Sequence, residues 1–183
     1  MSYLQSANGD SRILVELAAT ARETPAGCFV EVGVWKGGSA SYLTEVAKQQ
    51  NREIFLYDTF TGIPFAENYE VHKVGDFNDT SYEQVKAALP YAKVIQGIFP
   101  ESAIEMPPIA FAHIDVDQYK SYIDCINYLG PRMVDGGIMW FDDYVLSGAK
   151  KAVDELIGTK NLVFAKCGHK KVYTIFPQKP TNS

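Results

Sequence analysis

Two strand-like segments near the end of the chain limit its fold more than any other feature. Residues 162–166 and 172–176 are rich in branched and aromatic side chains, and only residues 167–171 separate them. A parallel neighbour requires a crossover of roughly a dozen residues or more, so these two strands must pair as an antiparallel hairpin. The chain therefore cannot fold into an all-parallel sheet.

Upstream of the hairpin, β-branched and aromatic runs alternate with amphipathic segments, which is typical of a parallel sheet covered by helices. The runs predict strands at residues 28–32, 54–58, 92–96, 110–114 and 137–141. The intervening segments predict helices that begin near Asp10 or Ser11, at Ser39, at Thr80, at Tyr119 and near Gly148. The pattern predicts an α/β chain with the three-layer αβα, Rossmann-like class I methyltransferase fold. Its seven-stranded, mostly parallel sheet ends in an antiparallel hairpin.

Composition favours one globular domain, residues 1–183, with neither a nucleic-acid nor a membrane partner. The formal net charge is −5, so the chain lacks the basic surface that displaces counterions from a nucleic acid. No apolar stretch approaches the roughly 20 residues that span a bilayer. Residues 1–10 are polar, unlike a signal peptide, and three widely spaced cysteines suit reduced thiols. We therefore expect a cytoplasmic protein.

A long segment without strand or helix periodicity follows the second predicted strand. Residues 59–79 contain Gly62, Pro64 and Gly75 in no sustained pattern. A loop of this length in a compact domain is usually functional or disordered. Residues 178–183 are expected to form a loose tail.

The turn after the first predicted strand has the composition of a cofactor-binding loop. It reads Glu31-Val-Gly33-Val34-Trp35-Lys-Gly37-Gly38-Ser39. Gly33 permits a tight turn, and Gly37 and Gly38 let the backbone approach a ligand at a helix N-terminus. The spacing matches the E-x-G-x-x-x-G form that holds the amino-acid part of S-adenosylmethionine (SAM). The alternative is a purely structural turn.

Asp58 ends the second predicted strand. A carboxylate at this place can accept both hydroxyls of a ribose, as in nucleotide-binding sheets generally. Asp58 viewed alone is equally consistent with a cap on the following loop.

Four aspartates follow two predicted strands that are neighbours in the sheet. Asp115 and Asp117 come after one strand, and Asp142 and Asp143 after the next. Asp115 and Asp117 share one strand face if the strand persists that far. Crowded carboxylates repel one another unless a cation lies among them, and Mg²⁺ prefers such oxygen ligands. The alternative is that Asp117 caps the following helix and that Asp142 and Asp143 cap a turn.

Three other polar residues are weaker candidates. His113 precedes the aspartates by two positions, but a lone histidine on a core strand is more often a hydrogen-bonded packing residue. His72 and Lys73 lie in the long loop, where they could touch a substrate.

Sequence blocks in a fixed order resemble the macrocin-type (TylF-like) O-methyltransferases, which methylate sugar hydroxyls of macrolide and aminocoumarin natural products. The blocks are residues 29–39, 57–64, 72–81, 97–100, 113–119 and 136–144. The family often has D-G-D where this chain has Asp115-Val116-Asp117, a change that keeps both acids.

The resemblance implies SAM as methyl donor and a Mg²⁺ ion held by Asp115, Asp142 and Asp143. It implies Asp117 as general base, with Asp115 beside it in the catalytic centre, and residues 59–80 as a mobile lid. The cofactor-binding residues that it implies are Glu31, Gly33, Val34, Trp35, Gly37, Gly38, Ser39, Asp58, Gly97, Ile98 and Phe99.

The sequence as a whole predicts a SAM- and Mg²⁺-dependent O-methyltransferase that acts on a small hydroxylated acceptor, a sugar or glycoside. Two alternatives stay open. Asp115-x-Asp117 could be the D-x-D motif of a metal-dependent glycosyltransferase, or the chain could be a non-catalytic SAM-binding module. The acceptor and the oligomeric state, a homo-oligomer included, are also open.

Overall fold

Seven strands form one sheet in the order β3-β2-β1-β4-β5-β7-β6 in the computed structural model, which describes residues 4–6, 11–166 and 171–176. The parallel strands are β1 (Cys28–Val32), β2 (Ile54–Asp58), β3 (Lys93–Gln96), β4 (Ile109–Ile114) and β5 (Met133–Phe141). The strand β7 (Val172–Ile175) pairs antiparallel with β5 and with β6 (Val163–Phe164). The predicted topology, terminal hairpin included, is confirmed.

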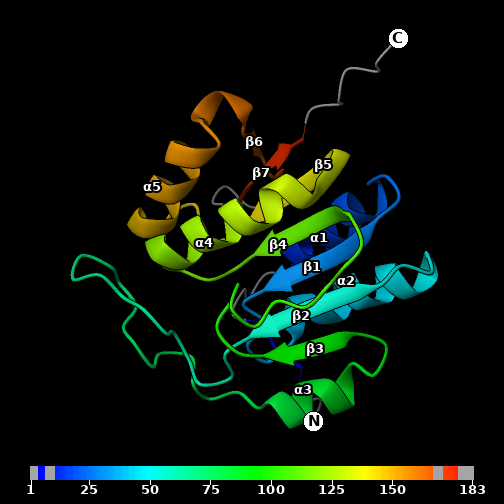
Figure 1. Cartoon of the computed structure of the whole chain (residues 1–183), viewed down its shortest axis with the longest axis horizontal. Coiled ribbons are helices and arrows are strands. Elements are labelled where there is room, and N and C mark those ends of the chain that lie inside the picture. The colour runs from blue at the N-terminus through cyan, green and yellow to red at the C-terminus, as the bar shows by residue number, and fades with distance from the viewer. Residues whose placement is uncertain (1–3, 7–10, 167–170, 177–183) are drawn as a thin grey trace.

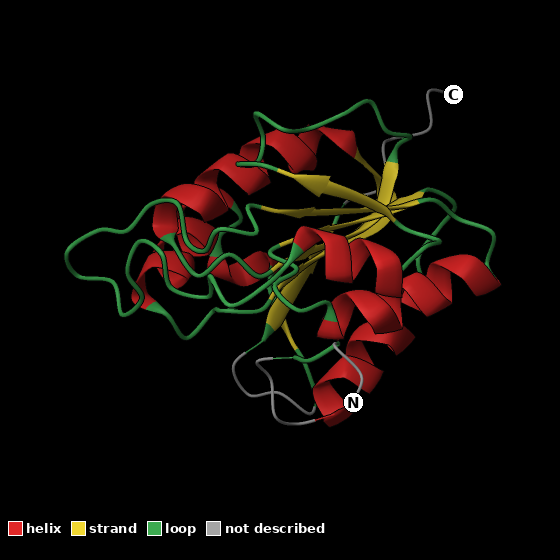
Figure 2. Ribbon diagram, turned by 90° about the horizontal axis from the view of Figure 1, so that it is seen from below, coloured by secondary structure: helices red, strands yellow, loops and turns green. Residues whose placement is uncertain are grey.

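Helices cover both faces of this sheet, as Figures 1 and 2 show. One face packs against α1 (Ser11–Arg22), α2 (Gly38–Gln49) and α3 (Tyr82–Ala88) through Leu17, Leu43 and Val85. The other face packs against α4 (Tyr119–Leu129) and α5 (Ser147–Leu156) through Tyr122 and Ala152. Short 3₁₀ helices span Gly130–Arg132 and Thr159–Asn161. The three-layer αβα architecture is therefore confirmed.

Burial of both sheet faces explains why the central strands are apolar throughout. In β1, Val30 and Val32 point into the core beneath α4 and α5, whereas Phe29 points into the core beneath α1 and α2. Every residue of β1 and β4 is buried, which is typical of central parallel strands.

Several element boundaries differ from the predictions. The strand β5 begins at Met133, which pairs with Ile109 ahead of a bulge, so it starts before the glycines that limited the predicted strand. The strand β6 is reduced to Val163–Phe164 because it lies at the sheet edge and has a partner on one side only.

Two predicted helix caps are wrong. Gly37, in the left-handed conformation, precedes α2, and Ser39 lies inside that helix. Ser81 rather than Thr80 caps α3, because its side chain accepts a hydrogen bond from the Gln84 N–H. The predicted cap Asp10 and the tail 178–183 lie outside the described residues.

The long loop between β2 and α3 lies at the end of the sheet to which the parallel strands point (Figure 1). Residues 59–79 contain neither helix nor strand, as predicted, and the loop continues to Ser81. Among the described residues, no helix has the length and apolar character required to cross a membrane.

Candidate active site

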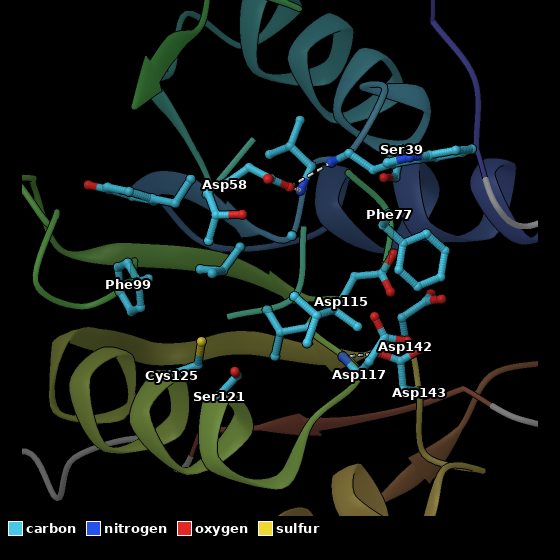
Figure 3. Close-up of a pocket in the computed structure, with 18 of the residues that line it drawn as sticks. Ser39, Asp58, Phe77, Phe99, Asp115, Asp117, Ser121, Cys125, Asp142 and Asp143 are labelled. Carbon is cyan, nitrogen blue, oxygen red and sulfur yellow. Dashed lines mark hydrogen bonds between the residues drawn. The ribbon is translucent and has the colours of Figure 1, made fainter. Parts of the chain in front are cut away.

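A cavity of about 480 Å³ opens where the strand order reverses, between β1 and β4. Ligands of open α/β sheets bind at this topological switch point, and the volume suits a small organic molecule. The turn after β1, the ends of β2 to β5, the long loop and α4 contribute to its lining (Figure 3). Nine of the eleven predicted cofactor-binding residues line it: Gly33, Val34, Trp35, Gly38, Ser39, Asp58, Gly97, Ile98 and Phe99.

The glycine turn has a backbone that only glycine accommodates. Gly33 has φ +90°, and a Cβ built on it would lie 1.8 Å from the Asp115 carbonyl oxygen. A Cβ on Gly38 would lie 2.4 Å from the Ser6 nitrogen. The glycines thus serve close packing of the turn against neighbouring backbone, and this packing brings the turn next to the first aspartate.

Asp58 caps this turn. Its Oδ2 accepts hydrogen bonds from the Val34 and Trp35 N–H groups at 2.8 Å each, and its Oδ1 accepts one from the Phe60 N–H at 2.6 Å. Trp35 and Phe60 both have positive φ, a conformation that needs such support in a non-glycine residue. The loop-cap interpretation of Asp58 is therefore confirmed, and its contact with a ribose stays a prediction.

Glu31 and Gly37 are the two predicted cofactor residues outside the cavity lining. Glu31 has no exposed surface, and its Oε1 accepts a hydrogen bond from the Ser39 hydroxyl at 2.5 Å. The second carboxylate oxygen, Oε2, is buried without a hydrogen-bond partner. Glu31 thus supports the turn from beneath.

All four predicted aspartates line the cavity, although β4 ends at Ile114 and strand alternation does not bring them there. Asp117 has φ +60°, and its N–H donates to Asp143 Oδ2 at 3.0 Å. Tyr122 bonds the same oxygen through its hydroxyl at 3.2 Å. The convergence depends on this connection between the loops after β4 and β5.

The aspartates do not cap α4. The Tyr119 N–H at the start of that helix donates instead to Glu70 Oε1 of the long loop at 2.7 Å. The helix-cap alternative for Asp117 is therefore wrong.

Loss of water and mutual repulsion raise the pKa values of three aspartates. Burial is the largest cause for Asp115, whose pKa lies well above the ordinary value, and the charges of Asp142 and Asp143 add to it. Burial and the same two charges raise the pKa of Asp117 to about 8. Burial and the charge of Asp142 raise the pKa of Asp143. Within the described residues, the positive charges near these three carboxyl groups do not offset their burial and mutual repulsion.

Two cationic side chains provide part of that charge. Lys171, immediately before β7, forms a close ion pair with Asp142 Oδ2. Its burial opposes protonation, but Asp142 and Asp115 outweigh the burial and raise its pKa. His113 lies 3.0 Å from Glu31 Oε1 and 3.4 Å from Asp142 Oδ1. Burial lowers the pKa of His113, whereas Asp142 and Glu31 raise it to about 10.

The donor set fits a divalent cation. Ligand atoms of His113, Asp115 and Asp142 lie within 4.8 Å of one another, and Asp143 lies beside them (Figure 3). In the described part of the chain, the carboxyl groups of Glu31 and the four aspartates lie near the cationic side chains of His113 and Lys171, and an additional cation would relieve their repulsion. Both nitrogens of His113 already face carboxylates, which leaves oxygen atoms as the available donors.

The long loop lies against both halves of the site. His72 Nε2 is 3.6 Å from Asp117 Oδ1, and the ring of Phe77 contacts those of His72 and Trp35. Asp79 accepts a hydrogen bond from Trp35 Nε1 at 2.8 Å. His72 and Phe77 line the cavity, whereas Lys73 does not.

Several residues of the cavity lining were not predicted from the sequence. Ser121 and Cys125 lie one helical turn apart on α4, a spacing that could have indicated a shared face. Gln5 and Ser6, before α1, could not be recognised from the sequence because they reach the turn through tertiary contacts. Lys171 was also missed.

Comparisons with known proteins agree with this architecture. The model of the macrocin-O-methyltransferase (TylF) family matches residues 12–164. The 8-demethyl-8-(2,3-dimethoxy-alpha-L-rhamnosyl)-tetracenomycin-C 4'-O-methyltransferase of Streptomyces olivaceus is 28% identical over 72% of this chain and 58% of its own length. The demethyldecarbamoylnovobiocin O-methyltransferase of Streptomyces niveus is 26% identical over 70% of this chain and 57% of its own length. The chain thus spans less than two thirds of these relatives.

Solved structures share the fold. The O-methyltransferase NovP superposes with a TM-score of 0.77 at 21% identity, over 91% of this chain and 80% of its own. The calicheamicin methyltransferase CalS11 superposes with a TM-score of 0.75 at 19% identity, over 90% of this chain and 77% of its own.

Proposed function

The chain belongs to the macrocin-O-methyltransferase (TylF) family, and from this membership we propose that it transfers a methyl group from SAM to a hydroxyl of a sugar or glycoside with the help of Mg²⁺. Relatives that methylate a rhamnosyl-tetracenomycin and a novobiocin precursor support this class of acceptor. Neither the family match nor the antiparallel hairpin favours the glycosyltransferase alternative.

One observation carries the proposal. A single cavity has the glycine turn on one side and the four aspartates on the other. Backbone contact between Gly33 and Asp115 joins the two sides. A methyl donor on the turn and a hydroxyl beside the aspartates would thus share one cavity, as direct transfer requires.

The residues around the turn would bind and orient the donor. Asp58 holds the Val34 and Trp35 backbone in the conformation that approaches a ligand closely. Gly97, Ile98 and Phe99 line the cavity after β3. Bound SAM would supply an electrophilic methyl group on a positively charged sulfur.

Asp117 is the proposed general base. It lies between the aspartate cluster and His72 of the long loop, and its backbone N–H is fixed by Asp143. Burial and the charges of Asp143 and Asp142 raise its pKa to about 8 in the metal-free protein, and a cation bound by those two aspartates would lower it toward neutral pH. A base whose pKa lies near the operating pH is the most effective in proton transfer.

Asp115, Asp142 and Asp143 would hold the metal. A divalent ion at these oxygens would polarise the acceptor hydroxyl and lower its pKa. The long loop, packed on Trp35 and Asp117, would exclude water from the reacting groups.

The test is transfer of radiolabelled methyl groups from SAM to a panel of rhamnosides and other glycosides, with Mg²⁺ and with EDTA. We expect product with Mg²⁺ only. Equal activity in EDTA would contradict the metal role, and S-adenosylhomocysteine (SAH) binding without turnover on any glycoside would favour the non-catalytic module. Stabilisation by UDP but not by SAH in a thermal-shift assay would favour the glycosyltransferase.

Asp117→Asn tests the base. We expect kcat to fall by about 10²–10⁴-fold while SAH affinity is kept. Asp124→Asn, the same substitution on the outer side of α4 where Asp124 pairs with Lys120, is the matched control.

A further inference from the structure

Four buried side chains of alternating charge cross the sheet at the cavity, where Asp142 and Lys171 line it and Glu31 and His113 do not. Glu31 belongs to β1 and His113 to β4, while Asp142 directly follows β5 and Lys171 directly precedes β7. These four strands are neighbours in the order β1-β4-β5-β7. The exposed fractions of the four residues are 0, 0, 3 and 7%. We call these four residues the charged row.

The charged row is continuous from the cofactor turn to the aspartates. Ser39, which lines the cavity, donates to Glu31 Oε1 at 2.5 Å. His113 lies 3.0 Å from that oxygen through Nδ1 and 3.4 Å from Asp142 Oδ1 through Nε2. Lys171 completes the row at the other carboxylate oxygen of Asp142.

Within the charged row, His113 links Glu31 on the side of the cofactor turn with Asp142 on the side of the aspartates. It has no exposed surface and does not line the cavity, so it acts on a ligand only through its two partners. An imidazole ring is rigid, so one orientation sets both contacts. Displacement of Glu31 would therefore disturb Asp142, and displacement of Asp142 would disturb Glu31.

We propose that His113 is a positioning residue that couples the cofactor turn to the aspartate cluster, so that cofactor binding and metal binding strengthen each other. The inference rests on the proposed function. A ligand that contacts Ser39 would favour the orientation of Glu31 and His113 seen here, and a metal that binds Asp142 would favour the same orientation of the ring. Each ligand would thus favour the arrangement that the other binds, which is the physical basis of positive coupling.

The test measures binding rather than turnover. SAH affinity is measured by calorimetry in EDTA and in saturating Mg²⁺, and Mg²⁺ affinity is measured with and without SAH. We expect each ligand to increase the affinity of the protein for the other by the same factor, about 5-fold or more, because coupling is reciprocal. Absence of coupling in the wild-type protein would overturn the inference alone, whereas failure to bind either ligand would overturn the proposed function with it.

Two substitutions separate the contacts of His113. The amide of His113→Asn reaches approximately the position of Nδ1, so it keeps the Glu31 side and should weaken Mg²⁺ binding. The amide of His113→Gln reaches approximately that of Nε2, so it should weaken SAH binding in EDTA. Both variants should lose the coupling. Thr44→Val removes a buried hydroxyl that has no hydrogen-bond partner, and it should keep the coupling.

Unchanged coupling in both His113 variants would refute the proposal. A direct metal-ligand role would instead abolish Mg²⁺ binding in both variants and leave SAH binding in EDTA unchanged. If neither variant folds, Ser39→Ala cuts the charged row at the cavity end. This variant should lower SAH affinity and the coupling, while its Mg²⁺ affinity without SAH stays within about 2-fold of the wild-type value. Unchanged coupling in this variant would also refute the proposal.

Discussion

Replacing Asp115 by asparagine is expected to stabilise the metal-free protein. Ligand atoms of Asp115, Asp142 and His113 lie within 4.8 Å of one another. At that distance a pair of unit charges interacts by about 3 kcal/mol at an effective dielectric constant of about 20. Repulsion from Asp142 and Asp143 opposes attraction to His113 and Lys171, so these charges offset one another in part. The loss of hydration remains, and it is the largest cause of the raised pKa of Asp115.

Asparagine keeps the shape of the side chain and removes this cost. We expect the free energy of unfolding in EDTA at pH 7.5 to rise by about 1–3 kcal/mol, the usual range for a polar group that loses water without full compensation. Tm should rise by roughly 2–4 °C for each kcal/mol. Urea titration gives the first quantity and calorimetry the second.

The pH dependence of stability tests independently whether Asp115→Asn stabilises the protein. Because the pKa of Asp115 is raised in the folded state, the wild-type protein loses stability as pH rises from the unfolded pKa, about 3.9, toward the folded one. The advantage of Asp115→Asn should therefore vanish near pH 4 and grow with pH.

Asp124→Asn, which breaks an exposed pair with Lys120 at 2.6 Å, should cost less than about 1 kcal/mol. Mg²⁺ should stabilise the wild-type protein more than Asp115→Asn. The reasoning fails if Asp115→Asn is no more stable than the wild-type protein in EDTA at pH 7.5.

Three further substitutions test the framework of the site. Gly33→Ala would place a Cβ 1.8 Å from a backbone carbonyl oxygen at φ +90° and should cost more than about 3 kcal/mol by urea unfolding. Its control is Gly75→Ala, at φ +89° with no atom within 4 Å of the added Cβ, which should cost only about 1–2 kcal/mol. Tyr122→Phe removes the hydroxyl that bonds Asp143 and should cost about 1.5–3 kcal/mol by urea unfolding. A loss below about 0.5 kcal/mol would contradict this role. Glu70→Ala removes the cap of α4 and should speed hydrogen exchange in the long loop, at a cost of about 0.5–2 kcal/mol; unchanged exchange would show that this contact does not hold the loop.

Local patterns carried much of the fold. The hairpin followed from a separation too short for a crossover, and the parallel strands followed from the alternation of strands and helices. Boundaries were predicted less well where pairing decides them. Met133 begins β5 because Ile109 lies opposite, and the sequence around Met133 does not contain that information.

Some residues of the site were also identifiable from the sequence, whereas their hydrogen-bond partners were not. Gly33 was identifiable because a required positive φ and a close backbone approach leave glycine as the suitable residue. Glu31 and Asp58 were recognised as important, but their hydrogen bonds place them as supports of the turn. Which partner a carboxylate takes depends on the backbone groups that folding brings to it.

The sequence by itself determined the sheet, its terminal hairpin, the glycine turn and the presence of aspartates at two strand ends, because each of these depends on local spacing. Tertiary structure alone decided how the charges are balanced. Lys171 directly precedes a strand, so its place in the sequence is not one at which ligand-binding residues of a parallel sheet are expected. The strand β7 runs antiparallel to β5, so its beginning lies at the edge where the parallel strands end, and its lysine meets Asp142 there.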